Sequence, residues 1–89
     1  MENFMITLDE IVARFSNHRI YFICEECTPS AIRDVVVVDD NNNLIASFIE
    51  WDNDESCVYM LVEHTECSLD DVINEFIAYG FYVEATQIN

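Results

Sequence analysis

The feature that most constrains the fold is the apolar stretch 44–64, which has the pattern of two strands around a polar tip. Residues 44–51 (LIASFIEW) and 57–64 (CVYMLVEH) are rich in aliphatic and aromatic side chains, and the sequence DNDES separates them. β-branched and aromatic runs on either side of a short Asp/Asn/Ser cluster are typical of a β-hairpin. We therefore predict a central hairpin against which the rest of the chain packs.

Other apolar runs predict further strands. Residues 19–24 form one run, and residues 34–39 form a second that holds four consecutive valines. The Asn-rich segment 40–43 predicts the turn after the valine run, because Asn tolerates left-handed backbone conformations better than most residues. Residues 81–87 predict a last strand, and the apolar lead-in at 3–6 predicts a short edge strand.

Two segments carry the signals of amphipathic helices. Thr7 with Glu10, and Ser68 with Asp71, each have the spacing of a capping box ahead of an apolar stripe at helical spacing. We predict helices from Leu8 to Asn17 and from Leu69 to Tyr79. Gly80, the only glycine, follows the second helix where a left-handed residue is favoured. Thr28 and Pro29 predict only a single helical turn.

Together these elements predict one α+β domain over residues 1–89. We expect an antiparallel sheet of about five strands with two amphipathic helices packed on one face, in the order α-β-β-β-β-α-β. The two helix–strand units match in sequence, for example Ile11 with Val72 and Phe15 with Phe76. Either internal duplication or the shared demands of a capped helix that leads into a strand explains this match.

This arrangement leaves one face of the sheet without a cover. The valine run and residues 58–62 are apolar at both odd and even positions, as in strands that are buried on both sides. We therefore predict a homodimer that pairs either sheet against sheet or strand against strand.

The composition restricts the function. The chain has eighteen Asp and Glu against three Lys and Arg, a formal net charge of −15, yet 52% of its residues are hydrophobic. A chain with this share of hydrophobic residues folds rather than forming a disordered acidic tail. The electrostatic field of its negative charge repels nucleic acids and anionic membranes and attracts basic protein surfaces. No leader and no membrane-length apolar run is evident, so we expect a cytoplasmic protein, in the host cytoplasm if a phage encodes it.

Metal binding and catalysis have weak signals. Cys24 and Cys27 form one pair of candidate zinc ligands, and His64 and Cys67 form another, but the strands that lead to them point in opposite directions. A calcium loop over residues 52–63 has a Cys where Gly is needed. No phosphate loop, nucleophile elbow or metalloprotease motif is present. We predict no catalysis, no metal and no cofactor, and reduced thiols.

The loop carboxylates carry the functional hypothesis. On a strand, alternate side chains stand about 6.8 Å apart, which is comparable to the spacing of phosphates along a nucleic-acid backbone. We predict partner contacts by a rim made of Asp39, Asp40, Glu50, Trp51, Asp52, Asp54, Glu55, Glu63 and Glu66.

Such a rim favours a nucleic-acid mimic that occupies the basic surface of a nucleic-acid-binding protein, in the manner of anti-CRISPR or anti-restriction inhibitors. This comparison rests on size and charge, because no motif ties the chain to a family. Two alternatives stay open: a small-molecule regulatory domain of the ACT type with its ligand between two chains, and an acidic adaptor whose charge only maintains solubility.

Overall fold

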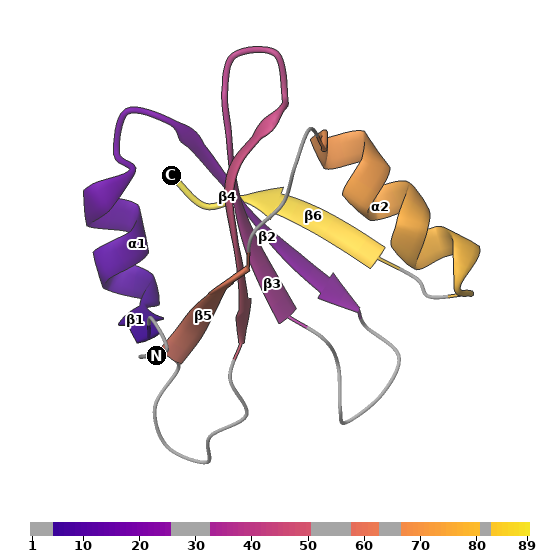
Figure 1. Cartoon of the computed structure of the whole chain (residues 1–89), viewed down its shortest axis with the longest axis horizontal. Coiled ribbons are helices and arrows are strands. Elements are labelled where there is room, and N and C mark those ends of the chain that lie inside the picture. The colour runs from indigo at the N-terminus through magenta and orange to yellow at the C-terminus, as the bar shows by residue number, and fades with distance from the viewer. Residues whose placement is uncertain (1–4, 26–32, 51–57, 63–66, 81–82) are drawn as a thin grey trace.

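The structure is a computed structural model that describes residues 5–25, 33–50, 58–62, 67–80 and 83–89. Within these ranges the chain forms six strands and two helices (Figure 1). In chain order they are β1 (Met5–Thr7), α1 (Leu8–Arg14), β2 (Arg19–Glu25), β3 (Arg33–Val38), β4 (Leu44–Glu50), β5 (Val58–Val62), α2 (Leu69–Ala78) and β6 (Val83–Gln87). The predicted α+β class is confirmed, and the short N-terminal edge strand β1 makes the sheet one strand larger than the predicted five.

All neighbouring strands pair antiparallel, in the order β1-β5-β4-β3-β2-β6. The predicted central hairpin is confirmed, because β4 and β5 pair from Ser47 opposite Val62 to Glu50 opposite Tyr59. The four central strands follow one another as a meander, and β1 and β6 form the two edges. The predicted turn at Thr28 and the tip of the central hairpin lie outside the described residues.

Both helices begin with the capping boxes that the sequence predicts. Thr7 Oγ1 accepts a hydrogen bond from the Glu10 N–H at 3.2 Å, and the Glu10 carboxylate accepts one from the Thr7 N–H at 3.3 Å. Ser68 and Asp71 make the same pair of bonds, at 3.2 and 3.0 Å, at the start of α2. α1 ends at Arg14 rather than Asn17. Residues 15–17, which include Ser and Asn, form a turn instead.

The two helices lie on opposite faces of the sheet, so the prediction that both pack on one face is wrong. Along β3, Val35 and Val37 belong to the hydrophobic cluster that contains Ile11 of α1. Val36 and Val38 belong to the cluster that contains Val72 of α2. Figure 1 accordingly shows the strands between α1 and α2. The valine run is therefore covered on both sides by one chain, which removes the need for a face-to-face dimer.

Chain connectivity explains the placement of the helices. α1 joins β1 to β2, and α2 joins β5 to β6, so both connections cross the sheet in the same direction. β1 and β5 are antiparallel neighbours, so the two connections start from strands that point in opposite directions. Crossovers between parallel strands are almost always right-handed. Two crossovers of the same hand that start from opposed strands must use opposite faces.

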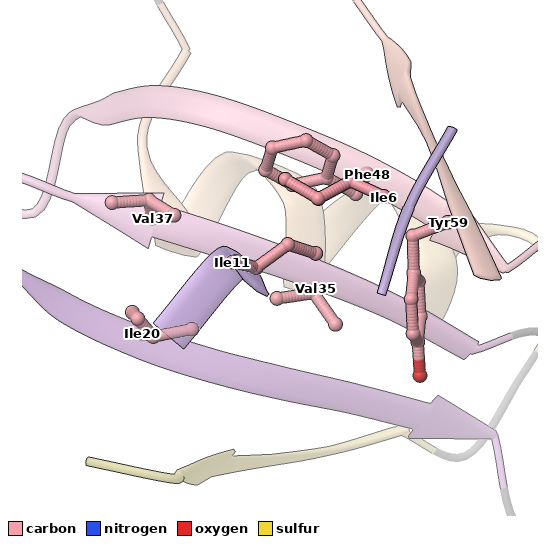
Figure 2. Close-up of a cluster of buried hydrophobic side chains, with 7 residues drawn as sticks. All are labelled: Ile6, Ile11, Ile20, Val35, Val37, Phe48 and Tyr59. Atoms are coloured by element: carbon pink, nitrogen blue, oxygen red, sulfur yellow. The ribbon is translucent and has the colours of Figure 1, made fainter. Parts of the chain in front are cut away.

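The core consists of two layers, one under each helix. On the α1 side, seven buried side chains pack together, as Figure 2 shows: Ile6, Ile11, Ile20, Val35, Val37, Phe48 and Tyr59. The rings of Phe15 and Phe48 lie 6.1 Å apart between centroids and are tilted, a favourable aromatic arrangement. Among the described residues, neither helix has the length and apolar character needed to cross a membrane.

Candidate protein-interaction surface

The structure describes part of the predicted rim of carboxylates. Asp39, Asp40 and Glu50 fall within the described residues. Trp51, Asp52, Asp54, Glu55, Glu63 and Glu66 lie outside them. The position of the described members decides whether they form one surface.

Asp40 and Glu50 lie at opposite ends of the β3–β4 hairpin. Asp40 is in the turn that connects the two strands, whereas Glu50 is the last residue of β4. β4 has seven residues, and a rise of about 3.4 Å per residue separates its ends by roughly 20 Å. Asp40 and Glu50 therefore cannot belong to one compact cluster, and the predicted rim consists of at least two separate parts.

Asp39 has a structural role in this turn. Its Oδ1 accepts hydrogen bonds from the backbone N–H groups of Asn41 at 2.8 Å and Asn43 at 3.0 Å. Its carbonyl oxygen accepts from Arg19 Nη2 at 2.7 Å. Asn42 has a φ of 64°, in agreement with the prediction that an Asn takes the left-handed position. Asp40 is exposed, so it is the carboxylate of this turn that presents itself to solvent.

The turn lies against the start of α2. The Leu69 N–H donates to the Asn42 carbonyl at 2.8 Å, and the Leu44 N–H donates to the Cys67 carbonyl at 2.8 Å. An isolated bridge between Asn43 and Ser68 joins the same segments. These contacts place the turn beside the first residues of α2. We call the exposed carboxylates of the two segments, Asp40, Asp70, Asp71 and Glu75, the acidic α2 surface.

No basic residue lies in α2 to neutralise this surface. The arginines of the chain are elsewhere: Arg14 is on α1 across the sheet, Arg33 is in β3, and Arg19 is half-buried. Arg19 donates to the Asp39 carbonyl and, at 3.4 Å, to the Tyr21 hydroxyl. The helix dipole and the capping bond of Asp71 favour the carboxylates in the first turn of α2, but they do not account for Asp40 and Glu75.

Cys67 reports the negative potential beside α2. Burial, followed by the charges of Asp71 and Glu75, raises the pKa of its thiol. The Sγ atom lies 3.7 Å from the Ser68 carbonyl, within reach of a weak S–H hydrogen bond. The acidic neighbours therefore disfavour the thiolate form of Cys67.

The placement of Cys24 also separates the candidate zinc ligands. Cys24 pairs with Arg33 near the end of β2. Cys67 lies beside Leu44, the first residue of β4, which is at the other end of the sheet. Cys27 and His64 lie outside the described residues, as do the candidate calcium ligands Asp52, Asp54, Ser56 and Glu63. Within the described part of the chain, no three His, Cys, Asp or Glu side chains are grouped to hold a metal ion.

The outer part of α2 also carries apolar side chains. Ile77 is 54% exposed, and Tyr79, the C-cap residue, is 72% exposed. The acidic α2 surface thus continues into apolar groups toward the C-terminal end of the same helix. Charged residues around exposed apolar groups are typical of protein–protein interfaces.

Asp34 is a buried acid in β3, at a position where the sequence predicts only the start of a strand. Its side chain is buried, and its Oδ1 has no hydrogen-bond partner among the described residues. Ile23 on β2 and Ile49 on β4 are its neighbours across the sheet. Burial raises the pKa of Asp34 to about 6. An Asp that directly precedes four valines in one strand was the available sequence signal.

A scan against protein-family models, a search of curated proteins and a search of solved structures each found no match.

Proposed function

We propose that this chain is an acidic interaction module that binds the basic surface of a nucleic-acid-binding protein and takes the place of its nucleic acid. Inhibitors of the anti-CRISPR or anti-restriction type act in this way. The observation that carries the proposal is the acidic α2 surface: four exposed carboxylates on adjoining segments, with no basic residue in the helix, next to exposed Ile77 and Tyr79.

Each part of this surface has a physical role in binding. The carboxylates, together with the net charge of −15, attract a cationic partner over a distance and raise its association rate. Charge alone gives little affinity once salt screens it, beyond about 8 Å at physiological ionic strength. Apolar anchors such as Ile77 and Tyr79 add area that becomes desolvated on binding, and anchors of this kind carry much of the binding energy in protein interfaces.

Among the alternatives, the structure offers no specific observation in favour of an ACT-type regulatory domain. That hypothesis places a ligand between two chains and so depends on a dimer, and the sheet face that suggested a face-to-face dimer is covered by α2. The acidic-adaptor alternative differs from the proposal in what it predicts when carboxylates are neutralised. It predicts that the variants are less soluble but bind their partners as the wild type does.

A charge-matched pair of variants tests the proposal. Asp70→Asn with Glu75→Gln removes two charges from the acidic α2 surface. Asp9→Asn with Glu84→Gln removes two exposed charges from α1 and β6. Each protein is immobilised and exposed to a bacterial lysate, and the bound nucleic-acid-binding proteins are challenged with double-stranded DNA and with rising salt.

The proposal predicts that DNA displaces the bound proteins, that binding weakens steeply with salt, and that only the α2 pair reduces capture, by about tenfold or more. Equal capture by both pairs, or capture that DNA does not affect, would contradict it. Thermal unfolding of each variant checks that the fold is intact.

A further inference from the structure

Asp34 lies on the face of the sheet that α2 covers. It pairs with Ile23 across β3 and β2, and directly opposed side chains project from the same face of a sheet. Ile23 belongs to the hydrophobic cluster that contains Val72 of α2, as does Val36, two residues along β3 from Asp34. The Asp34 carboxyl group is therefore set among the apolar side chains against which α2 packs.

Nothing within the described ranges compensates a charge on this carboxyl group. The side chain is 8% exposed, and its Oδ1 is inaccessible to water and has no hydrogen-bond partner there. A neutral carboxyl group is tolerated in such a place, whereas a carboxylate requires water, hydrogen-bond donors or a cation. Ionisation of Asp34 consequently favours any conformation in which water reaches it.

The elements packed on this face bring acids and neutral groups toward Asp34. α2 has no basic residue and carries Asp70, Asp71 and Glu75. On β2, Glu25 lies two residues beyond Ile23, on the same face. The remaining groups on this face are neutral hydroxyl, thiol, amide and aliphatic side chains: Tyr21, Ser47, Ile49, Cys67, Val83, Ala85 and Gln87.

The arginines do not offset this charge. Arg19 is on the same face but four residues from Ile23, roughly 14 Å along β2 at a rise of about 3.4 Å per residue. Its guanidinium donates to the Asp39 carbonyl and the Tyr21 hydroxyl. Arg33 pairs with Cys24, one step along the ladder, which strand alternation assigns to the opposite face. Arg14 is on α1, across the sheet.

α2 is the element whose release hydrates Asp34 most readily. Its deepest side chains, Leu69 and Val72, are each 7% exposed, whereas Ile11 of α1 is completely buried. The strand beside α2 is β6, an edge of the sheet whose residues 84–87 are exposed (Figure 1). Segments with few fully buried side chains open at a lower free energy than the core. We therefore expect α2 to open before the central strands unfold.

We propose that ionisation of Asp34 promotes the release of α2 from the sheet, so that the docking of this helix is a proton-linked equilibrium. The inference does not depend on the proposed function. Because α2 carries the acidic α2 surface, the same equilibrium makes the presentation of that surface depend on pH.

The direction of the effect follows from the two environments of the carboxyl group. Burial under α2 raises the pKa of Asp34 from 3.8 to about 6, and hydration in the released state returns it toward 3.8. The docked state therefore holds the proton more tightly, and docking weakens as the pH rises from about 4 through about 6. The opening constant of α2 increases by up to about 150-fold over the full range, and by about tenfold between pH 5 and pH 7.5.

Amide hydrogen exchange at pH 5 and pH 7.5 tests the proposal, with each rate divided by the intrinsic rate at that pH. Val72, whose N–H donates to the Ser68 carbonyl, reports the opening of α2, and Val36 reports the unfolding of the sheet. We expect Val72 to have the larger opening constant at both pH values, with the tenfold rise in the wild type. Asp34→Asn should abolish the rise, whereas Asp70→Asn, which removes an exposed carboxylate from α2 itself, should retain it.

Three results would overturn the proposal. The first is an opening constant at Val72 that does not change with pH in the wild type. The second is the same rise in Asp34→Asn, which would assign the effect to the general increase in negative charge. The third is an equal opening constant at Val72 and Val36 at both pH values, since Asp34 would then be hydrated only when the whole sheet unfolds. If Asp34→Asn does not fold, Asp34→Leu provides the same comparison without a titratable group.

Discussion

Asp34 lies directly opposite Ile23 in the ladder between β2 and β3, so a carboxylate is buried against an aliphatic neighbour. Burial raises the pKa of Asp34 from 3.8 to about 6, which means that the folded chain holds this proton more tightly than the unfolded chain. The free energy of unfolding should therefore decrease as the pH rises from about 4 to about 6. By linkage, the contribution of Asp34 to the free energy of unfolding is lower above pH 6 than below pH 4, by up to about 3 kcal/mol.

Asp34→Asn should remove this contribution. We expect the variant to be more stable than the wild type at pH 7.5, by about 1–3 kcal/mol, and to differ less from it at pH 4.5. Urea denaturation at the two pH values measures the effect, and Asp40→Asn, an exposed site, is the control. A wild-type minus variant difference that does not change with pH would show that Asp34 titrates normally.

The Ser68 cap should contribute measurably to stability. Ser68→Ala removes the acceptor of the Asp71 N–H at the start of α2 and should lower the free energy of unfolding by about 1 kcal/mol. Ser68→Thr retains a hydroxyl and should lose much less. Thr7→Ala tests the corresponding cap of α1, and similar losses at the two sites would show that the units are stabilised alike. No loss at either site would mean that water replaces the caps at no cost.

Gly80 tests backbone conformation separately from packing. It has a φ of +89°, and a Cβ added there would meet nothing within 4 Å. Gly80→Ala should therefore cost about 1 kcal/mol through the left-handed conformation alone. Gly80→Asn should cost less, because Asn adopts this region more readily. Chemical denaturation of both variants decides the matter, and equal stability of Gly80→Ala and wild type would indicate that the turn rearranges.

The separate acidic parts predict additive effects on partner binding. Asp52→Asn, Asp54→Asn and Glu55→Gln combined, at the tip of the predicted central hairpin, test the sequence-based rim, and Asp70→Asn with Glu75→Gln tests the acidic α2 surface. If both contact the partner, their losses of affinity should add in the combined variant, as for independent sites. Affinity is measured for each set and for the combined variant, at two salt concentrations. If one set alone lowers the affinity as much as the combined variant does, only that set contacts the partner.

The local features of this fold were predictable from the sequence, whereas its handedness-dependent features were not inferred. The caps at Thr7 and Ser68, the valine strand and the Asn-rich turn at 40–43 depend on neighbouring residues, and all are confirmed. The faces of the helices depend on the direction of the strand from which each crossover starts, which requires the complete strand order. The same alternation of Val35 and Val36 that suggested a bare face is what two helices on opposite sides require.

The candidate site shows the same division. The sequence predicts that Asp39, Asp40 and Glu50 form one rim because all three are acids near strand ends, but a hairpin sends the ends of β4 to opposite ends of the sheet. Asp70 and Glu75 were not among the predicted partner contacts, although their helix lies beside Asp40 through the backbone bond between Leu69 and Asn42. Long-range pairing, which a local pattern does not specify, creates this surface.

The strand order has a consequence for how the chain acquires its structure. The central strands β2 to β5 pair with their neighbours in sequence, so they can form early through short loops. The edges close last, because Met5 must find Met60 and Tyr21 must find Gln87, and each closure traps one helix against the sheet. Such non-local closures slow folding. We therefore expect a pulse of amide hydrogen exchange during refolding to protect Val36 before Thr86, whose N–H bonds toward β2, with the two faces of the sheet becoming buried in separate steps.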